Sequence, residues 1–146
     1  MKADLLNYCK VKVTQSMLEI KENLKLLQSD ANSNSKSAMG DKYETNRAMI
    51  HLEQENLASR YYNLEKQLKV LMDISTQSSD SVMLGSIIRT ESTSYFLTVG
   101  LGKIDFNGEV IYAIAANSPI GQSLLGKKVG DKVTVLKNEL IIKSVS

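Results

Sequence analysis

Apolar residues recur at every seventh position over the first part of the chain, and charged residues fill most of the positions between them. The spacing predicts one long helix from Ala3 to about Ser29, with a narrow apolar seam that packs against a single partner helix. The seam positions are Leu6, Val13, Ile20 and Leu27, with Met17 and Leu24 between them.

The same spacing returns between Glu44 and about Asp73, at Ile50, Leu57, Leu64 and Leu71, with Tyr61 and Leu68 between them. The intervening segment, "SDANSNSKSAMGD", is polar and ends in a Gly-Asp pair. Two helices of similar length joined by such a loop predict an antiparallel coiled-coil hairpin over residues 1–75. At ~1.5 Å per residue, each arm would be roughly 45 Å long.

The pattern changes after the polar stretch "DISTQSSDS", Asp73–Ser81, within which we place the linker between two domains at residues 76–81. Residues 82–146 contain five short β-branched stretches separated by turn residues, together with one short helix in "SPIGQSLLG". These stretches predict a small antiparallel β domain. The fold class expected for the whole chain is therefore α+β, a helical hairpin followed by a sheet.

Composition excludes several classes of function. The net charge is +2, with 18 basic and 16 acidic residues spread evenly, so there is no basic stripe of the kind that binds naked nucleic acid. Cys9 is the only cysteine, which rules out an internal disulfide or a cysteine metal cluster. We expect no signal peptide and no membrane span, and hence a cytoplasmic protein.

Motifs for an autonomous enzyme are incomplete. "GQSLLGKK" differs from a phosphate-binding loop because Lys128 stands where a hydroxyl is needed and no long helix follows. "GLGK", Gly100–Lys103, is a turn signal only. His51 has no second metal-ligating partner nearby in the sequence and is expected at the surface, and no serine has a neighbouring histidine base.

Asp41 and Glu44 stand three residues apart where the loop becomes the second helix. One interpretation is a capping box, in which Asp41 accepts hydrogen bonds from helix amides and Glu44 reaches back to the Asp41 amide. The other interpretation is a pair of carboxylates that holds a metal ion. Spacing alone favours the cap, whereas the position between two long helices favours the metal.

The segment "NSPIGQSLLGKKVGD", Asn117–Asp131, resembles the C-terminal domain signature of bacterial Gre-type transcription elongation factors, and "GDKYET" resembles their tip motif. The resemblance implies an FKBP-like sheet domain after an antiparallel coiled coil. It also implies that the chain binds RNA polymerase, inserts its coiled coil into the secondary channel and stimulates cleavage of backtracked RNA.

In this family the cleavage is the polymerase's own Mg²⁺-dependent activity, so the resemblance implies a factor that is not itself an enzyme. Asp41 and Glu44 would be the donated tip carboxylates, catalytic in that sense, and would hold Mg²⁺ jointly with the polymerase. No cofactor would be bound independently. The nascent RNA 3′ end and DNA would be met only within the elongation complex.

The resemblance also implies that the C-terminal domain docks on the polymerase. The residues expected at or beneath that contact are Ser118, Pro119, Ile120, Leu124, Gly126 and Lys127. The same motif is also explained by folding alone, with Pro119 fixing a turn and Leu124 and Leu125 filling the core. Prolyl isomerase activity is disfavoured, since residues 82–146 offer few aromatic residues for a pocket: Tyr95, Phe96, Phe106 and Tyr112.

Three residues depart from the family's tip pattern. The family usually has Asn directly after the Glu and Tyr three residues further on, whereas this chain has Thr45 and Ala48. Arg47 adds a positive charge beside the acidic pair. Two alternatives therefore remain: a secondary-channel-binding regulator or inhibitor without cleavage activity, and a coiled-coil adaptor whose acidic pair only caps a helix.

Overall fold

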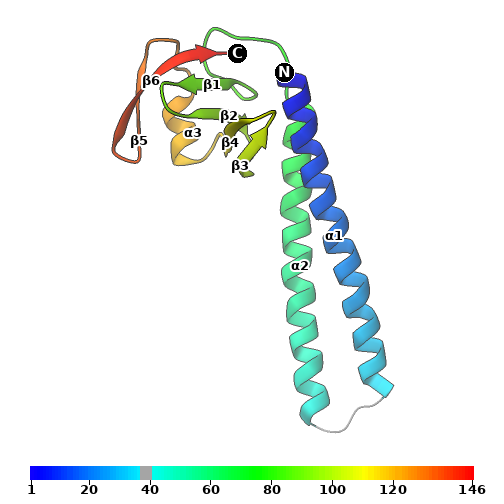
Figure 1. Cartoon of the computed structure of the whole chain (residues 1–146). Helices are drawn as coiled ribbons and strands as arrows, with labels where there is room; N and C mark the ends of the chain where they lie inside the picture. The colour runs from blue at the N-terminus through cyan, green and yellow to red at the C-terminus, as the bar shows by residue number, and fades with distance from the viewer. Residues whose placement is uncertain (37–40) are drawn as a thin grey trace. The chain divides into compact units, whose positions relative to one another are not determined.

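The computed structural model describes the backbone of residues 1–36 and 41–146 and the side chains of residues 1–31 and 44–146. Two long helices come first, and six strands and a short helix follow (Figure 1). The predicted α+β fold class is confirmed. The chain forms two compact units, one of Val11–Lys69 and one that combines Met1–Lys10 with Val70–Ser146.

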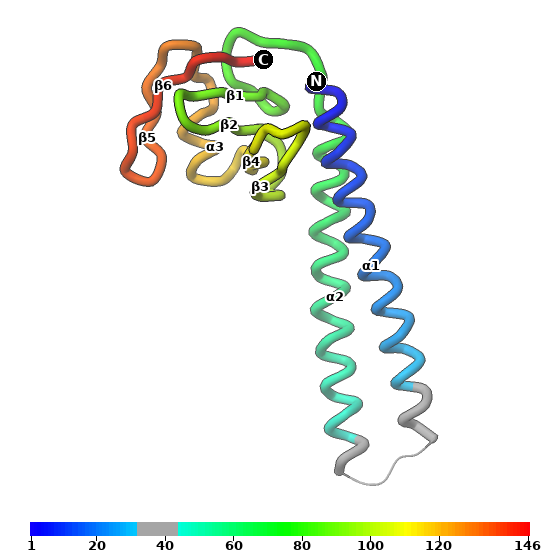
Figure 2. Tube along the Cα trace, in the orientation of Figure 1, coloured from blue at the N-terminus to red at the C-terminus, as the bar shows by residue number. Residues whose placement is uncertain are grey.

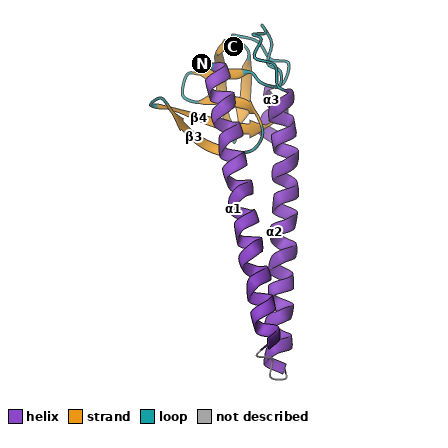
Figure 3. Ribbon diagram, turned by 90° about the vertical axis from the view of Figure 1, so that its right-hand side faces the viewer, coloured by secondary structure: helices purple, strands orange, loops and turns teal. Residues whose placement is uncertain are grey.

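The helices α1 (Lys2–Lys36) and α2 (Asp41–Asp73) run side by side in the Val11–Lys69 unit (Figures 2 and 3). Their contacts fix an antiparallel direction. The Lys21 ammonium lies 5.6 Å from the ring centroid of Tyr61, and further along α1 the Gln54 amide donates to Gln28 at 3.3 Å. A later residue of α1 thus contacts an earlier residue of α2. The two helices therefore run in opposite directions, as the predicted hairpin requires.

The predicted seam is the buried side of this pair. Val13, Ile20 and Leu57 are only 1%, 3% and 4% exposed. The predicted helix ends were too short, because α1 continues past Ser29 to Lys36 and α2 begins at Asp41 rather than Glu44. Serine and asparagine are weak helix formers, yet neither Pro nor Gly occurs before Gly40 to stop the helix. Residues 37–40, with the predicted Gly40 turn, lie outside the described residues.

The second unit is built on one six-stranded sheet, with strand order β3-β4-β2-β1-β6-β5. The polar linker before it carries no helix or strand between Asp73 and Ser81, as the sequence predicts. The strands are β1 (Ile87–Thr90), β2 (Ser94–Thr98), β3 (Gly102–Phe106), β4 (Glu109–Ala115), β5 (Lys132–Val135) and β6 (Asn138–Val145).

Two details of the predicted sheet were wrong. It has six strands rather than five, since β3 was not recognised: its sequence "GKIDF" offers one buried residue, Ile104, among glycine and charged side chains. The sheet is also not wholly antiparallel, because β2 and β4 pair in parallel, with Ser94 opposite Ile111 and Thr98 opposite Ala115. The missed strand forms the connection that makes this parallel pair possible.

Both faces of the sheet are covered within this unit. The short helix α3 (Pro119–Leu124) packs with one buried cluster: Val82, Ile88, Tyr95, Leu97, Leu124, Val133, Val135 and Ile142. Alternation along β2 turns Phe96 to the opposite face, where it is fully buried. Residues from the start of α1 belong to the same unit: Leu5 and Cys9 are fully buried, and the Tyr8 ring meets Phe106 edge-on at 5.8 Å.

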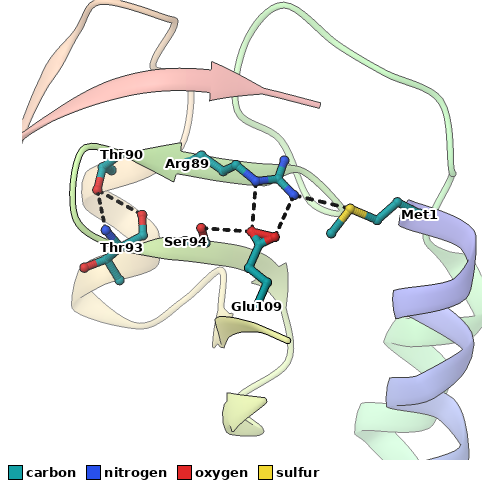
Figure 4. A network of polar contacts seen from close by, with 6 residues as sticks. All are labelled: Met1, Arg89, Thr90, Thr93, Ser94 and Glu109. Atoms are coloured by element: carbon teal, nitrogen blue, oxygen red, sulfur yellow. Dashed lines mark hydrogen bonds and ion pairs between the residues drawn. The ribbon is translucent and has the colours of Figure 1, made fainter. Parts of the chain in front are cut away.

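A polar network joins these elements (Figure 4). In the turn between β1 and β2, Thr90 Oγ1 accepts from the amide of Thr93 at 3.0 Å and donates to its carbonyl at 2.9 Å. The neighbouring residue on β1, Arg89, donates a hydrogen bond to Glu109 on β4. The Nη2 atom of Arg89 also contacts the Met1 sulfur at 3.3 Å. The start of α1 is thereby held to the middle of the sheet.

Candidate functional site

The segment with the family resemblance is built around the start of α3. Ser118 is its N-cap residue, with extended backbone angles (φ −74°, ψ 160°). Its hydroxyl accepts from the Gly121 amide at 3.0 Å and donates to the Ala115 carbonyl at 2.6 Å. Pro119 follows in the first turn, where a missing N–H costs nothing. The predicted turn and short helix are confirmed.

Gly121 is required by close packing rather than by its backbone angles. A Cβ atom at this position would overlap the Ala115 carbonyl oxygen and come within 2.9 Å of the Ala116 carbonyl oxygen. The Gln122 side chain donates to that Ala116 carbonyl at 2.9 Å. The helix therefore lies directly against the end of β4, and its position is fixed by backbone contacts.

The residues after α3 return to the sheet unit through backbone hydrogen bonds. The Val82 amide donates to the Lys127 carbonyl at 2.8 Å, and the Gly126 amide donates to the Val82 carbonyl at 2.9 Å. Gly126 has φ +79°, a left-handed conformation that favours glycine. Asp131 then accepts from the Lys128 amide at 2.8 Å. This segment is thus an ordered surface loop.

The predicted docking residues divide by exposure. Pro119, Gly126 and Lys127 are exposed, and Ser118 and Ile120 are half-buried. Leu124 is fully buried, so it can support a contact from beneath but cannot touch a partner. Its predicted core role is confirmed. The matching prediction for Leu125 was wrong, because this side chain is 37% exposed. Leu125 is the C-cap residue of α3 and does not belong to the buried side of the helix, which includes Gly121 and Leu124.

A cavity of about 350 Å³ opens beside Ile120, and the sequence did not predict it. None of its lining residues is charged; they are Ser92, Thr93, Tyr95, Tyr112, Ile114, Ile120, Val135, Leu136, Asn138 and Leu140. The rings of Tyr95 and Tyr112 lie 6.4 Å apart on neighbouring strands. Burial raises the pKa of Tyr95. The two tyrosines were noted in the sequence, but their parallel pairing was not foreseeable there.

The acidic pair lies in the first turn of α2, which begins at Asp41. Glu44 is exposed, and the side chain of Asp41 lies outside the described side chains. Residues three apart share one side of a helix, and the N-terminal end of the helix dipole favours negative charge. Two such carboxylates fit a partial donor set for a hydrated Mg²⁺, which prefers oxygen ligands and retains several waters.

In the described part of the chain, no three His, Cys, Asp or Glu side chains gather as the ligands of a metal ion would. His51 is exposed on α2, as predicted. Among the described residues, neither long helix has an apolar stretch sufficient to cross a bilayer.

These features define a class of protein: an antiparallel helical pair with carboxylates at the start of its second helix, and a mixed sheet domain with a serine-capped helix. Residues 77–144 match the family model described as transcription elongation factor, GreA/GreB, C-term. Over these residues the chain is similar to the GreA/GreB transcription elongation factors. The Gre-type resemblance seen in the sequence is confirmed.

Among curated proteins, the chain is similar to transcription elongation factor GreA of Clostridium perfringens strains SM101 and ATCC 13124. Each is 36% identical over 91 residues, which cover 57% of this chain and 55% of the relative. The chain thus spans about half the length of the curated relatives it matches.

Two solved structures were also matched. The GreA factor homolog 1 (Gfh1) protein of Thermus thermophilus is 19% identical, with 94% of each chain covered and a TM-score of 0.39. Gfh1 of Thermus aquaticus is 17% identical, with 92% of this chain and 91% of that chain covered and a TM-score of 0.36.

Proposed function

We propose that this chain is a transcription elongation factor that binds RNA polymerase, inserts its helical pair into the secondary channel and stimulates cleavage of backtracked RNA. The observation that carries the proposal is the match of residues 77–144 to the family model of the GreA/GreB C-terminal domain. The acidic first turn of α2 supports the cleavage role, since it places Asp41 and Glu44 on the same helical turn. The chain would act in the cytoplasm, and would meet RNA and DNA only inside the elongation complex.

In this proposal the factor contributes ligands rather than a complete active site. Asp41 and Glu44 would hold a hydrated Mg²⁺ together with the polymerase. When bound, such an ion would supply charge stabilisation for phosphodiester cleavage. The catalytic machinery remains that of the polymerase, and the chain is not an enzyme on its own.

Docking is assigned to the sheet domain. Pro119, Gly126 and Lys127 are exposed on the ordered loop around α3 and are available to a partner. Ser118 and Ile120 are partly accessible beside them, and Leu124 lies beneath. The Ser118 cap and the glycine contact at Gly121 hold this surface in place, so docking needs little reorganisation of the domain.

A second function is favoured by one specific observation. Arg47 is exposed and stands three residues after Glu44, on the same side of α2. Its positive charge opposes cation binding by the acidic pair. A factor with this arrangement could bind the channel and regulate or inhibit the polymerase without stimulating cleavage. A coiled-coil adaptor, in which the acidic pair only caps α2, is the third alternative.

The test uses purified, backtracked elongation complexes with Mg²⁺ and the full chain. Asp41→Asn/Glu44→Gln removes both negative charges but keeps side-chain size. Glu53→Gln/Glu55→Gln is the matched control, because both glutamates are exposed on the same helix beyond its first turn. Cleavage lost only in the first variant, with polymerase binding intact, supports the donated site. Binding without cleavage by the native chain supports the channel regulator, and no binding by any form supports the adaptor.

A further inference from the structure

The cavity of about 350 Å³ in the sheet unit is lined by two kinds of uncharged side chain. Five of the lining residues are aliphatic, and five carry a hydroxyl or an amide group. Three of the polar ones, Ser92, Tyr112 and Asn138, are exposed, so a ligand in the cavity can reach their polar groups. Small-molecule sites have walls of this mixed kind and volumes of roughly 300–1,000 Å³. The lining therefore suits a small, neutral ligand.

Two tyrosines on neighbouring strands give the cavity an aromatic wall. Tyr95 and Tyr112 are opposite each other in the parallel pair of β2 and β4, with ring centroids 6.4 Å apart and planes tilted by 44°. A ring inserted between two others needs roughly 7 Å, twice a carbon–carbon contact of about 3.5 Å, so no ring fits between them. The Tyr112 side chain is 38% exposed, whereas Tyr95 is only 6% exposed. A planar ligand therefore meets the accessible ring of Tyr112, in the offset or edge-to-face contact that aromatic groups prefer.

The turn between β5 and β6 adds a strained apolar residue to the same cavity. Leu136 and Lys137 have φ 50° and 71°, close to the 53° and 81° of Asn107–Gly108 in the turn between β3 and β4. Asn-Gly is the preferred sequence for such a turn, whereas Leu and Lys resist the left-handed conformation. Leu136 is also 83% exposed, so burial does not offset the strain. Strain of this kind is characteristic of binding sites, and Leu136 is one of the residues that line the cavity.

We propose that this cavity binds a small neutral molecule built on a planar ring with an amide-type hydrogen-bonding group, and that Leu136 packs against the bound ring. The ring contacts Tyr112, and its amide group exchanges hydrogen bonds with the Asn138 side chain, which offers both a donor and an acceptor. The uncharged lining selects against ions, because a charge buried there has no partner. This inference goes beyond the proposed function and does not depend on it.

The probe for this site is benzamide, and its binding to the full chain is followed by two-dimensional NMR. We expect saturable shifts at Tyr112, Ile120 and Leu136, with a Kd of about 1 mM, which is ordinary for so small a ligand. Two matched compounds test the ligand class. Benzoate keeps the ring but is an anion at neutral pH, and cyclohexanecarboxamide keeps the amide but is not planar. We expect each to bind at least about fivefold more weakly than benzamide.

A first pair of variants tests the aromatic wall. Tyr112→Leu removes the accessible ring but keeps an apolar side chain on β4. Tyr62→Leu is the matched control, because Tyr62 is an exposed tyrosine on α2, outside the cavity. We expect Tyr112→Leu to weaken benzamide binding about tenfold and Tyr62→Leu to leave it within about twofold. The melting temperature of each variant shows whether the fold is intact.

A second variant, Leu136→Asn/Lys137→Gly, gives the strained turn the sequence that the chain already uses at Asn107–Gly108. We expect its melting temperature to rise by a few degrees, because the strain is removed. We expect its affinity for benzamide to fall about fivefold, because the contact with Leu136 is lost. A more stable protein that binds less tightly is a result that a purely structural role for Leu136 would not give.

The outcomes that overturn the proposal are distinct. Shifts that do not saturate, or that fall on residues away from the cavity, overturn the site. Equal binding of benzamide and benzoate overturns the neutral ligand class. Equal benzamide binding by the native chain, Tyr112→Leu and the turn variant overturns the roles of the aromatic wall and of Leu136. None of these results concerns polymerase binding or RNA cleavage, so each leaves the proposed function as it stands.

Discussion

The guanidinium of Arg89 on β1 forms a two-point ion pair with the carboxylate of Glu109 on β4, across the intervening strand β2. Nε lies 2.9 Å from Oε1, and Nη2 lies 3.2 Å from Oε2. Ser94 on β2 donates to the same Oε1 at 3.2 Å. One carboxylate therefore connects three strands, including the pair that runs in parallel.

This relationship makes stability depend on pH. The hydrogen bond from Arg89 lowers the pKa of Glu109, and its charge adds to that effect. Since the folded pKa lies below the unfolded value of about 4.3, the stabilisation is complete above that pH and is lost as pH falls through the folded pKa. We expect Glu109→Gln to remove this part of the acid dependence.

At pH 7, Glu109→Gln should lower the free energy of unfolding by about 1 kcal/mol or less, because both side chains are about a third exposed. Urea unfolding measured at pH 7 and at pH 3 checks the expectation. Glu139→Gln, at an exposed position on β6, is the control for loss of a negative charge. A native chain and Glu109→Gln that lose stability equally on acidification would contradict the assignment.

Gly121→Ala tests the contact between α3 and β4. The added methyl would overlap the Ala115 carbonyl, and backbone atoms cannot move aside as a flexible side chain would. We expect a loss of about 3 kcal/mol in the free energy of unfolding. Gly100→Ala is the control, since no atom lies within 4 Å of a Cβ there and its φ is not positive. Similar urea midpoints for the two variants would refute the tight contact.

Leu124 and Leu125 are adjacent in sequence but opposite in environment. Leu124 is fully buried, whereas Leu125 is 37% exposed. We expect Leu124→Ala to cost about 3 kcal/mol of unfolding free energy and Leu125→Ala to cost about 1 kcal/mol or less. Denaturation followed by circular dichroism separates the two. A larger effect at Leu125 would restore the sequence-based prediction that it fills the core.

The helical pair offers the same kind of comparison. Leu57 in the seam is 4% exposed, and Leu52 outside it is 59% exposed. We expect Leu57→Ala to lower the free energy of unfolding by about 3 kcal/mol, with only a small change for Leu52→Ala. Thermal melting of both variants in the full chain checks this. Equal melting temperatures would mean that the seam contributes little to stability.

The predicted features that the structure confirms are those encoded locally. The heptad spacing at Val13, Ile20 and Leu57 gave the helical pair, since side-chain position on a helix follows directly from sequence spacing. The short helix after Ser118 was also predictable, because its cap and its proline are neighbours in sequence. Periodicity and turn chemistry are sufficient for elements of this kind.

The features that were missed depend on contacts between distant residues. The parallel register of β2 and β4 brings Tyr95 opposite Tyr112, and nothing in either strand alone specifies that pairing. The cavity follows from this pairing together with Ile120 and Leu136, so it could not be predicted either. In the first turn of α2, the sequence identified Asp41 and Glu44 as candidate metal ligands, and that role stays a prediction.

The first ten residues belong to the same compact unit as the sheet. The segment Val11–Lys69 is therefore an insertion between two parts of that unit. Its two helices are in antiparallel register, and their seams repeat every seven residues. Removing one heptad from each helix at facing positions would preserve both seams and shorten the pair by about 10 Å. Residues 1–10 and the sheet domain would keep their own contacts. The length of the helical pair is therefore a property that evolution or an engineer can change in fixed increments without redesigning the rest of the protein.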